Sequence, residues 1–156
     1  MKSKLQLVIP LLLIGVFTLI PSILINIEGI ADKSINFETI AQGWNSDYTT
    51  HEYIVIDSQV LWVKIWDQTF SSIQPQPETP YIDFTQNSVI AVFSGFKPTG
   101  GYSINITKIR VKITSVYVYV ENISPPPEVE VPAVITFPYH IIKTQKLFLN
   151  IIFQRI

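Results

Sequence analysis

The sequence predicts a β-rich domain with one helix, preceded by an N-terminal transmembrane or signal helix. Three observations support this fold class. From residue 37 onward, short apolar runs and alternating runs have the character of β-strands. Residues 58–70 have helical spacing instead, and residues 5–25 contain no charged side chain. We therefore expect an all-β or β-rich α+β fold, an antiparallel sandwich or partly closed barrel, in residues 31–156, behind an anchor or signal segment in residues 1–30.

Length and composition exclude several classes of protein. The chain has 156 residues, no cysteine and a net charge of −1, which suits one domain with an extension. Without cysteine there is no disulfide framework, no thiolate nucleophile and no cysteine metal site. No nucleic-acid partner is expected, because that would need a clustered basic face.

Residues 5–25 have the length and composition of a membrane span, which needs about 20 residues. Lys2 and Lys4 precede the span, so the N-terminus is expected in the cytoplasm and the C-terminal domain outside. We favour a retained anchor. A cleaved signal peptide is the first alternative, because residues 29–31 have small-x-small spacing. A buried core segment is the second.

The first elements of the domain are predicted in order along the chain. Residues 37–41 and 52–56 are strand candidates, with turn residues 43–50 between them. Asp57 or Ser58 is a suitable N-cap for the helix. Its two tryptophans could form a ligand-stacking platform, but packing onto a sheet is the favoured interpretation. We expect six residues on one side of the helix to be buried: Leu61, Trp62, Ile65, Trp66, Thr69 and Phe70.

The middle of the chain contains the clearest strand signals. Residues 71–80 hold three prolines and form a loop, and residues 83–87 form a turn. Residues 88–93 are apolar on both faces, which predicts a central strand. A glycine-containing turn joins it to the strand that begins at residue 102, as in a hairpin. The apolar positions then change parity, which predicts a β-bulge near Thr107–Lys108.

The last third of the chain completes the predicted sheet. Residues 115–122 form another strand. The proline-rich residues 124–132 are expected to be an exposed connection, with a polyproline-II ligand as the alternative. Residues 133–144 and 146–154 are predicted to form a closing hairpin that turns near Thr144–Gln145.

No catalytic, metal or cofactor motif is found in the sequence. His51 and His140 are the two histidines, and neither has a partner at metal-ligand spacing. We expect each to be a surface or half-buried strand residue, and we interpret the chain as a non-enzyme without cofactor. Asn105 and Asn122 begin glycosylation sequons, which suits an exported domain.

The turn at residues 97–102 is the main candidate binding loop. Pro98 fixes one φ angle, and Gly100–Gly101 permit positive φ. The turn thus presents Lys97, Thr99 and Tyr102 together on a rigid loop. The alternative is that the turn only connects two strands.

Residues 81–106 resemble the C-terminal domain family of PrcB, a subunit of a protease complex. The likeness rests on an Asp-Phe turn, an apolar strand and a Thr-Gly-Gly-Tyr loop, here residues 99–102. Pro138 and Tyr139 match a later element of the family, so the resemblance covers roughly residues 52–153. It implies a small β-rich module of exported, often membrane-linked proteins that associates with a protease or another envelope protein.

Two other functions remain open. The Lys2–Ser3 pair before an apolar helix resembles the processing site of archaeal pilin-like subunits, whose partners are filament neighbours. Residues 97–100 resemble part of the binding loop of chagasin-type protease inhibitors. Our main expectation is a contact surface for an extracytoplasmic protein, with Tyr102 and Tyr139 as anchors. The expected partner-binding residues are Lys97, Pro98, Thr99, Gly100, Gly101, Tyr102, Pro138 and Tyr139.

Overall fold

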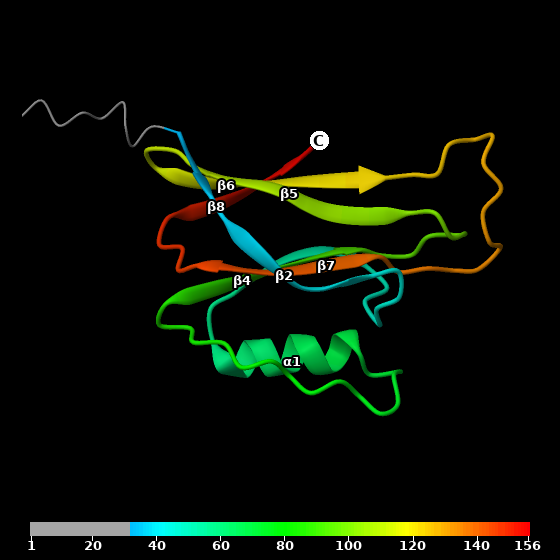
Figure 1. Ribbon diagram of the computed structural model, residues 1–156, viewed down its shortest axis with the longest axis horizontal. Helices are drawn as coiled ribbons and strands as arrows, with labels where there is room; N and C mark the ends of the chain where they lie inside the picture. The colour runs from blue at the N-terminus through cyan, green and yellow to red at the C-terminus, as the bar shows by residue number, and fades with distance from the viewer. Residues whose placement is uncertain (1–31) are drawn as a thin grey trace, which may run out of the picture.

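The structure, a computed structural model that describes residues 32–156, contains two stacked four-stranded sheets and one helix on the outer face of the second sheet (Figure 1). This confirms the predicted β-rich fold with a single helix, and the sheets do not close into a barrel. The elements are β1 (Lys33–Ile35), β2 (Phe37–Gly43), β3 (His51–Ile56), α1 (Gln59–Thr69), β4 (Asn87–Ser94), β5 (Ser103–Val111), β6 (Ser115–Ile123), β7 (Tyr139–Gln145) and β8 (Asn150–Arg155).

The sheet that carries the helix has the strand order β2-β7-β4-β3, and all its pairs are antiparallel. β4 lies between β7 and β3, which confirms the prediction of a central strand. Both of its faces are covered: Phe93 packs on the helix side, and Val92 packs against the other sheet. The absence of polar alternation in β4 follows from this double burial.

α1 covers the outer face of this sheet (Figure 1). The indole nitrogens of Trp62 and Trp66 donate hydrogen bonds to the carbonyls of Pro80 and Pro77, at 2.8 and 2.9 Å. Both rings are buried in one core with residues of β4, which confirms that the tryptophans pack the helix onto the sheet, while the two bonds attach the helix to the loop that follows it. Five of the six predicted residues are buried, and Leu61 is half-buried.

The other sheet has the order β1-β5-β6-β8, and β8 runs parallel to β6. The predicted closing hairpin is therefore wrong, because β7 and β8 belong to different sheets. Alternation in β8 is compatible with any neighbouring strand, so the sequence pattern could not identify its partner. The predicted hairpin between β4 and β5 is also wrong. Both edges of β4 are occupied by β7 and β3, so the chain crosses to the other sheet instead.

The predicted bulge in β5 is confirmed by a register shift between Ile106 and Lys108 against β6. The extra residue turns Ile109 back into the core between the sheets. The predicted N-terminal helix at residues 5–25 lies outside the described residues. Within residues 32–156, no helix combines the length and apolar character needed to cross a membrane.

Candidate partner-binding surface

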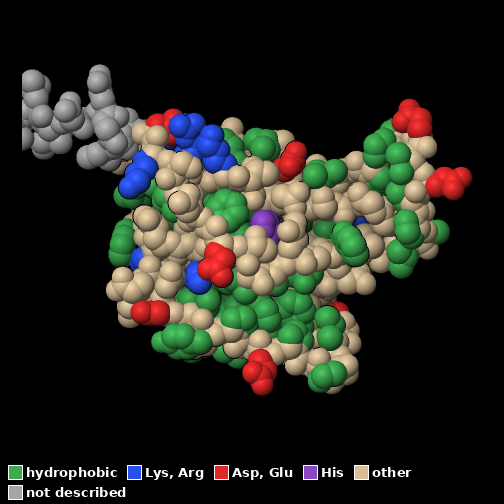
Figure 2. Space-filling model, viewed as in Figure 1, with side chains coloured by type: hydrophobic (Ala, Val, Ile, Leu, Met, Phe, Trp, Pro, Cys, Tyr) green, Lys and Arg blue, Asp and Glu red, His purple; other side chains and the backbone are tan. Residues whose placement is uncertain are grey.

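Three loops meet at one end of the molecule: residues 44–50, 95–102 and 124–138 (Figure 1, right). Lys97 and Thr136 exchange backbone hydrogen bonds of 2.9 and 3.1 Å. The amide of Phe137 donates to the carbonyl of Trp44 at 2.7 Å. These bonds join the three loops into one surface, which we call the loop end. Figure 2 shows hydrophobic side chains (green) over this part of the molecule.

Close packing at the loop end explains why two of its residues are glycines. Gly101 has a φ of 83°, and an added Cβ would lie 2.8 Å from Cγ1 of Val131. The amide of the neighbouring Gly100 donates to the carbonyl of Pro132 at 2.9 Å. The predicted loop is therefore held against the proline-rich connection, which makes it rigid.

The predicted loop residues are brought together at this end. The Lys97 ammonium lies 5.6 Å from the ring centroid of the half-buried Tyr102, a cation–π contact. Pro98 is exposed, and Thr99 accepts a hydrogen bond from the Thr136 hydroxyl at 2.9 Å through its carbonyl. Lys97 and Thr99 are each half-exposed, so a partner can reach their side chains.

Pro138 and Tyr139 lie beside the base of the loop but are buried. The Pro138 carbonyl accepts a hydrogen bond from the amide of Ser94 at 2.8 Å. Tyr139 is only 7% exposed and packs edge-to-face on Phe70, with ring centroids 5.7 Å apart. Burial also raises the pKa of Tyr139. Its ring belongs to the core under the helix, so we do not retain it as an anchor of the surface.

Trp44 is a surface residue within the predicted turn at residues 43–50. It directly follows β2, and its side chain is 71% exposed. The other two tryptophans, Trp62 and Trp66, belong to α1 and are buried between the helix and the sheet. The available signal was a tryptophan within a polar turn, because tryptophan is enriched among the residues that contribute most to protein interfaces.

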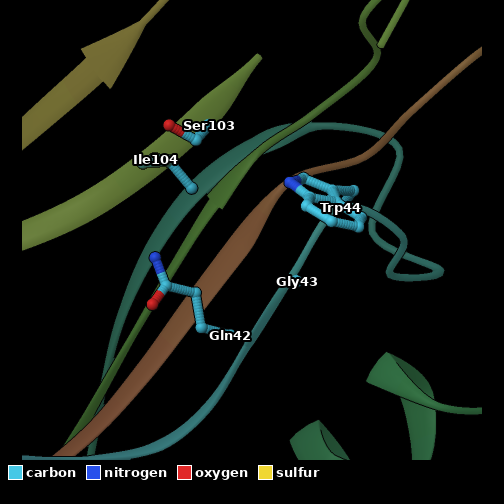
Figure 3. A pocket seen from close by; sticks show the side chains of 5 residues that line it. All are labelled: Gln42, Gly43, Trp44, Ser103 and Ile104. Carbon is cyan, nitrogen blue, oxygen red and sulfur yellow. The ribbon is translucent and has the colours of Figure 1, made fainter. Parts of the chain in front are cut away.

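Trp44 lines two hollows. The first, of about 320 Å³, lies between the end of β2 and the start of β5 and is called the strand hollow (Figure 3). The second, of about 310 Å³, lies beside the predicted loop and is called the glycine hollow. All lining residues are uncharged. The strand hollow is lined by Gln42, Gly43, Trp44, Ser103 and Ile104. The glycine hollow is lined by Trp44, Gly100, Gly101, Pro132, Val134 and Thr136.

The two sequon asparagines have different surroundings. The half-buried Asn105 accepts a hydrogen bond of 2.5 Å from the Gln42 side-chain amide, through its Oδ1. Its Nδ2, the atom that would carry a glycan, takes no part in that bond. In Asn122 the Nδ2 is buried without a hydrogen-bond partner. A glycan on Asn122 would therefore require that nitrogen to become exposed.

His140 is more buried than the sequence analysis predicted, because it lies between the two sheets. It is 4% exposed, and its Nδ1 accepts a hydrogen bond of 2.9 Å from the amide of Ile106 in β5. Its Nε2 lies 2.9 Å from Oγ1 of Thr39 in β2. An accepting Nδ1 is unprotonated, so the proton is on Nε2 and donates to Thr39. Burial lowers the pKa of His140 to about 4.

No candidate metal centre is found in residues 32–156. This part of the chain contains no group of three or more histidine, aspartate or glutamate side chains that could hold a metal ion. The two hollows at the loop end are lined by uncharged side chains, which suit binding through shape and hydrogen bonds.

Comparison with known families identifies the central part of the chain. Residues 88–145 match the family model described as PrcB C-terminal, which confirms the resemblance over this segment. The match runs from β4 to β7 and includes the whole predicted loop. No curated protein and no solved structure matches the chain.

Proposed function

We propose that this chain is a non-catalytic accessory module that associates with a protease or another cell-envelope protein outside the cytoplasm. The observation that carries the proposal is the PrcB C-terminal match over residues 88–145. That segment contains both the loop at residues 95–102 and the whole connection against which it packs.

The geometry of the loop end supports a binding role. Its loops are joined by backbone hydrogen bonds, and its glycines permit close packing. A rigid surface loses less conformational entropy on association than a flexible one. Trp44 adds a large exposed apolar side chain, of the type often found at the centre of protein interfaces.

The proposed location follows from the N-terminal sequence. Residues 5–25 would form the membrane anchor, with Lys2 and Lys4 on the cytoplasmic side. Such an anchor would hold the module beside other proteins of the envelope. This raises its effective concentration near a membrane-linked partner.

The proposal is tested with the tagged full-length chain in its native membranes. Proteins are cross-linked in intact cells, solubilised in mild detergent, purified through the tag and identified by mass spectrometry. We expect a reproducible extracytoplasmic protein, and a protease would match the family resemblance. A chain that is recovered alone would contradict the proposal, and a chain recovered only as a homopolymer would favour the filament alternative.

A further inference from the structure

The chain enters the domain at the end opposite the loop end, and we call this the entry end (Figure 1, left). Lys33 of β1 pairs with Val111 at the end of β5, whereas β5 starts at the loop end. Asp32, the first described residue, forms an ion pair with Arg110 of β5. The start of the described chain is therefore fixed to the entry end.

Basic side chains gather on the sheet surface at the entry end. Ile109 and Val111 of β5 face the core between the sheets, so the alternate residues of this part of β5 face outward. Lys112 continues the outward face, since its ammonium lies 4.3 Å from the ring centroid of Tyr117 in β6. Figure 2 shows Lys and Arg side chains (blue) gathered at this end, at upper left. The group, which we call the basic patch, consists of Lys33, Lys108, Arg110 and Lys112.

The positive charge of the basic patch is not balanced by neighbouring carboxylates. Within residues 32–156, the ion pairs join Arg110 to Asp32 and Lys143 to Glu38. The three lysines of the patch are exposed and belong to neither pair. Even with Asp32 and the preceding Glu28 counted against the patch, two positive charges remain, although the whole chain has a net charge of −1. An anionic surface would therefore be attracted to this end.

Exposed apolar side chains lie at the tip of the same end. Ile113, in the turn between β5 and β6, is 62% exposed, and Phe148, between β7 and β8, is 86% exposed. Ser115 at the start of β6 pairs with Asn150 at the start of β8, which brings these two turns side by side. Apolar side chains beside lysines combine the two attractions, apolar burial and charge, that hold proteins at an anionic membrane surface.

The proposed anchor would keep the entry end close to lipid. If residues 5–25 span the membrane, residues 26–31 connect the span to the domain, and six residues reach at most about 20 Å. The basic patch would then be held at a high effective concentration beside the lipid headgroups. A weak attraction for each lysine is enough under these conditions. The place of the patch beside the entry of the chain thus favours lipid phosphates over other anions.

We propose that the entry end docks on the anionic lipid phosphates of the membrane that carries the anchor. The lysines of the basic patch bind the phosphates, and Ile113 and Phe148 lie among the headgroups. β5 extends for nine residues, about 30 Å, from the loop end toward the entry end, so docking turns the loop end away from the lipid. This inference rests on the proposed function, because it requires the anchor in residues 5–25.

The first experiment compares the two ends of the full-length chain in lipid nanodiscs. The chain has no cysteine, so Ile113→Cys or Val134→Cys provides a single position for a fluorescent label. Val134 is the matched control, because it is 51% exposed and lies at the loop end. Lipids with a nitroxide headgroup should quench the label at position 113 and leave the label at position 134 unquenched. Equal quenching at the two positions would overturn the inference.

The second experiment tests the charges with the label at position 113. Quenching should be stronger in discs of phosphatidylcholine mixed with phosphatidylglycerol than in discs of phosphatidylcholine alone. Lys108→Gln/Lys112→Gln should lower the ratio of docked to undocked domain in the mixed discs by about tenfold. Lys64→Gln, an exposed lysine of α1, should leave this ratio unchanged. Equal quenching in the two kinds of disc, or an equal effect of both variants, would contradict binding through the basic patch.

A third experiment identifies what covers the entry end in native membranes. A photo-cross-linking benzoylphenylalanine in place of Ile113 should capture lipid, and capture of an acidic protein instead would overturn the inference. If the chain is anchored but position 113 meets no lipid, this inference fails alone. If the chain is not recovered with the membrane at all, the anchor of the proposed function fails with it.

Discussion

The imidazole of His140 hydrogen-bonds to strands of both sheets, and this position keeps it uncharged. The Ile106 amide requires a lone pair on Nδ1, so protonation there would break that bond and leave a buried charge. Sequence spacing could indicate only that His140 lies on a strand. It could not show that two strands distant in sequence, β2 and β5, would surround the ring.

The first prediction concerns pH. The pKa of His140 is about 4 in the folded chain and 6.5 in the unfolded chain, so the unfolded state binds the proton more tightly. Stability is therefore complete above pH 6.5 and falls as the pH drops toward 4, by about 3 kcal/mol in total. Urea unfolding at pH 7.5 and 4.5 measures this change. His140→Gln, which cannot titrate, should show a clearly smaller difference, and an equal difference would refute the assignment.

The second prediction concerns Trp66. It is buried, contacts Phe70 at a centroid distance of 4.5 Å and bonds to Pro77. Trp66→Ala should lower the free energy of unfolding by about 3–5 kcal/mol, because it leaves a cavity and an unpaired carbonyl. Val60→Ala, on the exposed side of the same helix, should cost less than about 1 kcal/mol. Chemical denaturation of both variants provides the test, and similar losses would contradict the assigned packing.

At the scale of elements, the bulge and the turn residues could be predicted from the sequence, whereas the partners of the strands could not. The change of parity around Thr107 predicted the bulge, since side chains in a strand alternate strictly. The glycine-containing turn, in contrast, suggested a hairpin, although it connects two sheets. Turn residues determine local backbone angles, and they do not determine which sheet the next strand joins. For a similar reason the turn pattern around Trp44 did not predict that its side chain would be exposed.

The third prediction tests the rigidity of the loop. Gly101→Ala should destabilise the domain by about 1–3 kcal/mol, because the new methyl group meets Val131 and Pro125 at a positive φ. Gly100→Ala should cost less, since it has no positive φ and its nearest contact would be 3.2 Å from Pro132. Thermal unfolding compares the two variants. If Gly101→Ala were neutral, the loop would be free to move, and its proposed preorganisation would be wrong.

At the scale of the whole molecule, the residues that stabilise the fold lie mostly apart from the proposed binding surface. One core lies between the sheets, and the other attaches α1 to the outer face of the sheet containing β4. The three loops of the loop end lie together at one end of the two sheets (Figure 1), and Tyr48 is the one of their residues that belongs to either core. Changes at its exposed side chains should therefore alter binding with little effect on folding.

The fourth prediction concerns topology. If residues 5–25 anchor the chain with Lys2 and Lys4 inside, protease added to intact cells should digest the C-terminal domain. Immunoblotting with an antibody against residues 32–156 would follow the digestion. A cytoplasmic marker protein should stay intact in the same sample. Complete protection of the domain until the membrane is disrupted would refute this topology.

The central claim is that the loop end is the surface through which the module binds its partner. Its most direct test is the affinity of the purified partner for three forms of the full-length chain. These are the wild type, Lys97→Ala/Thr99→Ala at the loop end, and Phe148→Ala at the opposite end. We predict that the loop-end variant binds about tenfold more weakly at unchanged thermal stability, while Phe148→Ala binds like the wild type. Equal affinities for all three forms would contradict the claim.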